Sequence, residues 1–213
     1  MASQRVLHDH FFREAKRNGY RSRAAYKLAE IDDKRNILQK KDFVLDLGAA
    51  PGSWLQVTSQ RVGPCGKVIG VDLQEIKNLQ LDNVTTMQED VTTLSLDTLG
   101  EDELFDVILS DMAPSTTGNR TIDHHSSVRL CHTALDIAAT LLKPKGNLVM
   151  KVLEGGAYKE LLERCETCFS VARGFKPKAS RAISTEMYVV CTGRREDMQK
   201  PVKVAPPRPS SGW

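Results

Sequence analysis

The chain has 213 residues, 40% of them hydrophobic, with five cysteines and a net charge of +3. These values suit one compact α/β domain with a sizeable core, and the odd, scattered cysteines argue against a disulfide framework. No run approaches the roughly eighteen apolar residues of a membrane span, and no secretory or transit-like leader opens the chain, so we expect a soluble, cytoplasmic protein.

The N-terminal segment concentrates positive charge, with seven basic and two acidic side chains in residues 1–27. Apolar spacing predicts a short helix from Val6 to Ala15 and a second helix capped by Ser22, with Lys27 one turn from Arg23. Such a local excess favours a polyanionic partner, because each neutralised phosphate releases counterions. A merely solvated charged surface is the alternative, both here and for a second cluster without acids, at Arg173, Lys176, Lys178 and Arg181.

The stretch FVLDLGAAPGSW at residues 43–54 predicts a buried strand, a tight turn and the start of a helix. Asp46 is the single charge of the strand, and Gly48 and Gly52 allow the backbone to pass close to a bound group. Pro51 suits the first helical position, where no N–H is needed. The positive end of that helix can receive the carboxylate or phosphate of a nucleotide-like ligand. The glycines do not spell GxGxxG, and an ordinary strand-to-helix turn is the alternative.

Strand and helix patterns alternate after this stretch, which predicts a parallel sheet. A helix should carry residues 55–62, and further elements are expected as strands at 67–72, 84–87, 105–110, 147–152 and 187–191 and helices at 124–142 and 157–168. Residues 169–173 form one more strand, and no convincing helix separates it from 187–191. We therefore expect these last two strands to pair antiparallel at the end of the sheet.

Three aspartates, Asp72, Asp90 and Asp111, follow the carboxyl ends of predicted strands, where ligands bind in open α/β sheets. Asp72 comes 24 positions after Gly48, near the interval at which an acid accepts hydrogen bonds from ribose hydroxyls. Asp90 can serve a base such as adenine in the same way. Strand-end aspartates are common in turns, which is the alternative for each one taken alone.

Lys151 is unusual because it lies inside the apolar strand NLVMKVL, where an unpaired buried ammonium would cost several kcal/mol. It is either an edge lysine that reaches water or a functional lysine beside Asp111. Adjacent strand ends bring such side chains together, and Glu186, just before the last strand, is a fourth candidate charge for the same crevice.

Other patterns indicate little chemistry. Cys165 and Cys168 form one CxxC without a matching second pair, so we expect no metal site. No GxxxxGK[ST] motif supports nucleotide hydrolysis. Residues 196–213 are rich in proline and poor in core-forming side chains, which predicts a disordered tail.

Five motifs, SRAAYKL, DLGAAPGSW, SDMAP, MKV and SRAISTEMYVV, resemble those of the FtsJ/RrmJ family of S-adenosylmethionine-dependent ribose 2′-O-methyltransferases. The resemblance covers about residues 5–195. It implies a Rossmann-like methyltransferase fold with a mostly parallel seven-stranded sheet, an antiparallel end strand and helices on both faces. We therefore expect a single catalytic domain over residues 1–195, with basic RNA-binding helices in residues 1–27.

The resemblance also implies roles for individual residues. The family's catalytic Lys-Asp-Lys-Glu tetrad falls on Lys27, Asp111, Lys151 and Glu186. Cofactor-binding positions fall on Gly48, Gly52, Ser53, Trp54, Asp72, Asp90 and Asp111, with Ser53 standing where many bacterial members have a second glycine. Lys151 acts either as the base for the 2′-hydroxyl or as the group that orients it, and the sequence leaves both open.

The substrate implied by the resemblance is a uridine of large-subunit ribosomal RNA, presented on the assembled subunit to a monomeric enzyme. Arg21, Arg23, Arg173, Lys176, Lys178 and Arg181 are the expected RNA contacts. Three alternatives are a tRNA methyltransferase, a nicotinamide-dependent oxidoreductase and a non-catalytic ribosome-assembly factor. The missing GxGxxG argues against the second and the intact tetrad against the third.

Overall fold

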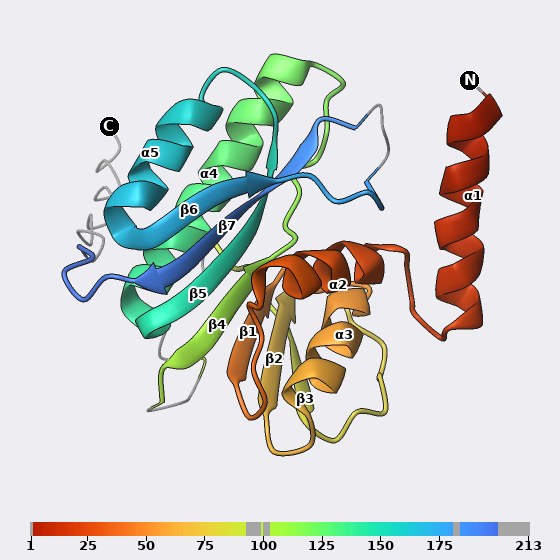
Figure 1. Cartoon of the computed structure of the whole chain (residues 1–213), viewed down its shortest axis with the longest axis horizontal. Helices are drawn as coiled ribbons and strands as arrows, with labels where there is room; N and C mark the ends of the chain where they lie inside the picture. The colour runs from red at the N-terminus through yellow and green to blue at the C-terminus, as the bar shows by residue number, and fades with distance from the viewer. Residues whose placement is uncertain (1, 93–98, 100–102, 181–183, 200–213) are drawn as a thin grey trace, which may run out of the picture.

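The computed structural model describes residues 2–92, 99, 103–180 and 184–199, with only the backbone for residues 2–9 (Figure 1). Its centre is a seven-stranded sheet in the order β3-β2-β1-β4-β5-β7-β6. The strands are β1 (Phe43–Leu47), β2 (Lys67–Asp72), β3 (Val84–Gln88), β4 (Phe105–Ser110), β5 (Leu142–Leu153), β6 (Phe169–Phe175) and β7 (Glu186–Arg194). β7 pairs antiparallel with both β5 and β6, and the pairs among β1 to β5 are parallel. The predicted fold class is confirmed.

Helices cover both faces of this sheet (Figure 1). Side chains alternate between the faces of a strand, so Val44 of β1 packs with α2 (Ala24–Arg35) and α3 (Ser53–Val62). Leu45, its neighbour, packs with α4 (Arg120–Leu141) and α5 (Tyr158–Cys168) on the other face. The N-terminal helix α1 (Ala2–Arg17) stands apart from the sheet and leads into α2. The two hydrophobic cores therefore hold β1 and β4 from both sides.

The turn after β1 differs from the prediction in one respect. Helix α3 begins at Ser53 rather than at Pro51, because Gly52 precedes it with a left-handed φ of 104°. A residue in that conformation cannot continue a right-handed helix, so Pro51 lies in the turn and not in the first helical position.

Helix α4 begins four residues earlier than the apolar pattern indicated. The side chain of Asn119 accepts hydrogen bonds from the backbone N–H groups of Thr121 and Ile122 at 3.0 and 3.3 Å. An asparagine cap of this kind satisfies amides that have no partner inside the helix. The cap, and not hydrophobic periodicity, determines where α4 starts.

Other boundaries also differ from the prediction. β5 begins at Leu142, five residues early, because Leu142 is buried and pairs with Phe105 before a register shift. Residues 73–83, between β2 and β3, contain no helix, so strict alternation fails there. Near the C-terminus Met198 is buried in the core, and the proline-rich residues 200–213 of the predicted tail lie outside the described part.

Asp46 is the one charged side chain inside β1 and is fully buried. Neither of its carboxyl oxygens has a hydrogen-bond partner within the described part of the chain. Burial, and then the nearby carboxylates of Asp111 and Asp72, raise the pKa of Asp46 well above its usual range. The folded protein therefore favours the protonated form of this carboxyl group.

This raised pKa makes a prediction about stability. The folded state holds the Asp46 proton more tightly than the unfolded state, so the stability of the wild type should fall as pH rises above the ordinary aspartate pKa of about 3.9. The Asp46→Asn variant lacks this penalty. Urea unfolding should show the variant to be the more stable protein at pH 7, with the difference shrinking toward pH 4. A wild type that stays the more stable at every pH would contradict the assignment.

Candidate active site

Four charged side chains meet where β4, β5 and β7 lie side by side. Lys27 projects from α2, Asp111 follows β4, Lys151 lies near the end of β5 and Glu186 begins β7. Lys27 Nζ donates to both carboxylate oxygens of Glu186, at 2.7 and 2.8 Å. Lys151 Nζ lies 3.1 Å from Asp111 Oδ1 and 4.0 Å from Glu186 Oε1, and it also donates to the backbone carbonyl of Asp111. The structure thus brings all four residues of the predicted tetrad into one network.

Strand register explains this convergence. Ser110, the last residue of β4, pairs with Met150, so Asp111 emerges beside Lys151. Antiparallel pairing with β7 then sets Leu153 opposite Glu186. Lys27 completes the group from α2, which covers this end of the sheet. Sheet topology and the packing of α2 therefore juxtapose residues separated by up to 159 positions in the chain.

The network is largely shielded from water, with side-chain exposures of 8% for Lys27, 14% for Glu186 and 10% for Lys151. Burial raises the pKa of Glu186, but the adjacent Lys27, Lys151 and Arg23 outweigh it, so that the pKa lies below its ordinary value. Glu186 is therefore ionised at neutral pH and places a negative charge between two lysines. Alternating charges compensate for the desolvation that an unpaired buried ammonium would suffer.

Tyr188 is a member of this network that the sequence reading missed. It is fully buried on β7 opposite Lys151, and its hydroxyl donates to Asp111 Oδ1 at 2.8 Å. Burial and the neighbouring carboxylates raise the pKa of Tyr188 well above its usual range, so the phenol remains a donor. Its ring packs against Trp54 with centroids 5.6 Å apart. The sequence could have indicated this, because Tyr188 lies two positions after Glu186 in the same strand and such residues point to the same face of the sheet.

The turn between β1 and α3 contains two glycines in left-handed conformations, Gly48 with a φ of 75° and Gly52 with 104°. A Cβ on Gly48 would lie 2.8 Å from Met112 Cγ and 2.9 Å from the Met112 backbone, and one on Gly52 would lie 3.1 Å from Leu79. At these two positions the close approach is thus made by the protein's own loops. Glycine is required here by both conformation and space.

The two residues after Gly52 direct their side chains into the protein. The Ser53 hydroxyl lies 2.7 Å from that of Ser22, and Trp54 donates from its indole to the carbonyl of Ala24 at 2.9 Å. Both side chains are buried. Any contact of Ser53 or Trp54 with a cofactor would therefore come from their backbone amides at the start of α3. The N-cap residue of that helix, Gly52, makes no side-chain capping hydrogen bond, and the first turn has no acidic residue, so the positive end suits an anionic ligand group.

The strand-end aspartates lie where the sequence placed them. Asp72 accepts hydrogen bonds from the backbone amides of Ala50 and Gln74, at 2.9 and 2.8 Å. Asp90 accepts from the amide and hydroxyl of Thr92, and these hydrogen bonds lower the pKa of Asp90. A carboxylate has about four lone-pair sites, so each can still accept from a ligand hydroxyl or amine.

The predicted RNA contacts separate into distinct groups. Arg21 donates to the carbonyls of Pro51 and Asn78, at 2.8 and 2.7 Å, and so bridges the loops after β1 and β2. Arg23 is close enough to Glu186 to contribute to its lowered pKa. Three members of the second cluster, Arg173, Lys176 and Lys178, are exposed, and Arg181 lies outside the described residues.

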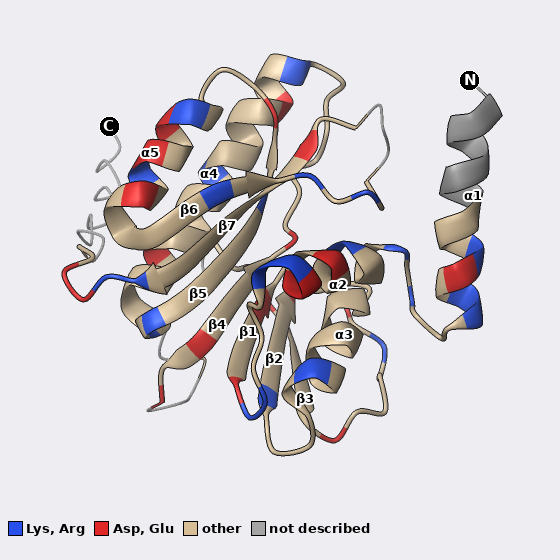
Figure 2. Ribbon diagram, in the orientation of Figure 1, with Lys and Arg blue, Asp and Glu red and all other residues tan. Residues whose placement is uncertain are grey.

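The two basic clusters are linked through α2. The carboxylate of Glu30 on that helix accepts a hydrogen bond from the backbone amide of Lys178, at 2.8 Å. Figure 2 shows the ribbon coloured blue, for lysine and arginine, on the segment before α2 and on the strand and loop that follow α5. The second cluster therefore reaches α2, the helix that also carries Lys27.

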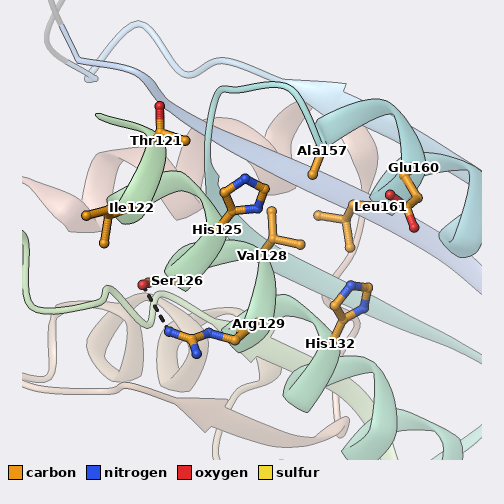
Figure 3. A pocket seen from close by; sticks show the side chains of 10 residues that line it. All are labelled: Thr121, Ile122, His125, Ser126, Val128, Arg129, His132, Ala157, Glu160 and Leu161. Carbon is orange, nitrogen blue, oxygen red and sulfur yellow. Dashed lines mark hydrogen bonds between the residues drawn. The ribbon is translucent and has the colours of Figure 1, made fainter. Parts of the chain in front are cut away.

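A hollow of about 550 Å³ lies between α4 and α5 (Figure 3). Ten side chains line it, among them His125, Arg129 and His132 of α4 and Glu160 of α5. None of the predicted site residues borders it. In the described part of the chain no group of three or more His, Cys, Asp or Glu side chains is arranged to hold a metal ion. The described helices include none that is both long and apolar enough to cross a membrane.

Comparison with known proteins agrees with this geometry. A family model described as FtsJ-like methyltransferase matches residues 20–194. Two proteins named ribosomal RNA large subunit methyltransferase E are similar: that of Nitratidesulfovibrio vulgaris is 45% identical over 190 residues, spanning 88% of this chain and 93% of its own length. That of Methanosarcina acetivorans is 43% identical over 187 residues, spanning 85% and 67%. A Plasmodium falciparum crystal structure, assigned to a ribosomal RNA methyltransferase, superposes with a TM-score of 0.72 and 30% identity, over 82% of this chain and 98% of that one.

The position of Arg21 gives a test of the turn. Replacing it by alanine removes both hydrogen bonds to the Pro51 and Asn78 carbonyls, so amide hydrogen exchange should accelerate in residues 49–56 and 77–80. Lys16→Ala, a change at an exposed basic residue of α1, is the matched control and should leave both segments unchanged. Equal protection in Arg21→Ala and wild type would mean that the arginine does not hold these loops.

Proposed function

The chain belongs to the FtsJ-like methyltransferase family, and on that premise we propose that it transfers a methyl group from S-adenosylmethionine to the ribose 2′-hydroxyl of a uridine in large-subunit ribosomal RNA. The observation that carries the proposal is the buried network of Lys27, Glu186, Lys151 and Asp111 beside the turn after β1. Its charges are arranged to hold a hydroxyl and to handle one proton, which is what methyl transfer to an alcohol requires.

Ribosomal RNA as the substrate is supported by the relatives. The bacterial and the archaeal relative described above are both named for the large ribosomal subunit, and the bacterial one aligns over 93% of its length. Because the chain belongs to a methyltransferase family, the alternative of a nicotinamide-dependent oxidoreductase is excluded. The intact network gives no support to a protein that only assists ribosome assembly.

The residues around the turn fit S-adenosylmethionine. The positive end of α3, where the N-cap residue is Gly52, suits its carboxylate, Asp72 suits its ribose hydroxyls and Asp90 suits its adenine. When bound, this cofactor supplies an electrophilic methyl group on a sulfonium. The protein's task is then to exclude water and to present the hydroxyl in line with that methyl.

Lys151 has the geometry to present the hydroxyl. Two of the three tetrahedral positions on its Nζ are directed to the carbonyl and the carboxylate of Asp111. The distance to Glu186 Oε1 is 4.0 Å, longer than a hydrogen bond, so the third position is available for the ribose oxygen. If that position carries hydrogen it orients the hydroxyl, and if it is a lone pair it accepts the proton. Lys27 holds Glu186 in place, and Tyr188 does the same for Asp111.

RNA would reach this site across α2. Arg23 stands near the network, and the exposed Arg173, Lys176 and Lys178 lie on the segment that contacts the same helix. Phosphate contacts of this kind position a strand without reading its sequence. Arg21, by contrast, is committed to the loops around the turn, so its contribution to RNA binding would be indirect.

Substitution of Lys151 tests the proposed chemistry. Lys151→Met keeps most of the side-chain volume and removes the amine, so methyl transfer from labelled S-adenosylmethionine to ribosomal RNA should fall by about 10²–10⁴-fold. Calorimetry should show cofactor affinity close to that of the wild type. Lys151→Arg keeps the charge but cannot accept a proton, so residual activity there would favour orientation over base catalysis. Wild-type rates in a folded Lys151→Met protein would remove Lys151 from the mechanism.

A further inference from the structure

The backbone that carries Lys151 loses one of its neighbours at the active site. The last pair between β4 and β5 joins Ser110 to Met150, and the chain of β4 then turns away at Asp111. On the other side β7 still pairs with β5 as far as Leu153. The peptide groups from Lys151 onward that would face β4 therefore need other partners, because buried backbone groups are costly when unpaired.

Three side chains of α4 supply these partners. Cys131 Sγ donates to the carbonyl of Lys151 at 3.1 Å, and Ser127 Oγ accepts from the amide of Leu153 at 3.0 Å. His124 Nδ1 lies 2.7 Å from the carbonyl of Leu153, while its Nε2 accepts from the amide of Ala157 at 2.9 Å. The spacing of these residues, three and then four, places them on one face of the helix. We call His124, Ser127 and Cys131 the α4 seam.

His124 is the most constrained residue of the α4 seam. It is buried with 2% exposure, and its two ring nitrogens make one hydrogen bond as donor and one as acceptor, which fits only the neutral ring with hydrogen on Nδ1. The backbone of Gly155 lies directly against the ring, since a Cβ there would be 2.3 Å from His124 Cγ. The imidazole thus connects the end of β5, at Leu153 two residues after Lys151, to the start of α5.

We infer that His124 is a positioning residue for catalysis, acting through the backbone of β5 to hold Lys151 Nζ at Asp111. This inference rests on the proposed function. Its physical basis is that the position of Lys151 depends on the peptide groups at the end of β5. These groups are hydrogen-bonded to β7 on one side and to the α4 seam on the other. A displacement of about 1 Å at a reacting group can cost on the order of 100-fold in rate, so loosening one side should be visible in turnover.

The neighbouring histidine provides a matched control. His125 is exposed on the same helix and lines the hollow between α4 and α5 (Figure 3). His124→Phe keeps a planar ring against Gly155 but loses both hydrogen bonds, whereas His125→Phe makes the same substitution on the solvent side. His124→Asn can retain a donor to the Leu153 carbonyl and should lie between the two.

Steady-state methylation of ribosomal RNA is the experiment, with folding checked by circular dichroism. We expect His124→Phe to lower kcat roughly 10- to 100-fold while KM for RNA and for S-adenosylmethionine changes less than about twofold, and His125→Phe to match the wild type. A folded His124→Phe protein with the kcat of His125→Phe would overturn the inference. If His124→Phe does not fold, Ser127→Ala carries the test, with a smaller loss of kcat expected and an unchanged kcat overturning it.

A second readout separates this inference from the proposed function. Absence of methyl transfer by the wild type would refute the function, and the α4 seam would then be tested by nuclear magnetic resonance of the Lys151 side-chain nitrogen. That resonance should move in His124→Phe and stay in place in His125→Phe. An unmoved signal in His124→Phe would show that the seam does not position Lys151.

Discussion

The alternation of two largely shielded lysines with two carboxylates is the interaction on which the rest of the site depends. Lys27, Glu186, Lys151 and Asp111 follow one another as cation, anion, cation and anion at distances of 2.7, 4.0 and 3.1 Å. Removing one member would leave an uncompensated charge in a largely dry environment, which costs several kcal/mol in proteins. The network therefore requires that the ends of β4, β5 and β7 and the helix α2 stay close together.

The helical layers on the two faces of the sheet hold these elements together. On one face the start of α2 and the segment before it are hydrogen-bonded to the turn after β1 and the start of α3, through Arg21, Ser53 and Trp54. The same contacts therefore position Lys27 and the proposed cofactor site. On the other face the α4 seam holds the end of β5 where β4 has left it. Contacts within the protein on both faces of the sheet thus stabilise the site.

Much of this could be predicted because it is local or repetitive. Strand-and-helix alternation gave the parallel sheet, and an ammonium at Lys151 within an apolar strand signalled a buried partner. The role of Tyr188 was not predicted, because a tyrosine in an apolar strand is usually a core residue. Its hydrogen bond depends on which strand lies opposite. The hydrogen bonds of Arg21 were not predicted, because the carbonyls that it binds belong to loops 30 and 57 residues away. Such long-range pairings are set by topology, which periodicity does not report. RNA contacts, cofactor contacts and domain limits are still predictions.

The proposed methyl transfer to ribosomal RNA can be tested by mapping ribose 2′-O-methylation across total RNA from cells with and without this protein. We expect one 2′-O-methyluridine in large-subunit ribosomal RNA to disappear when the protein is removed, and every tRNA position to be unchanged. A methylation map of ribosomal RNA that does not change, or a loss confined to tRNA, would contradict it.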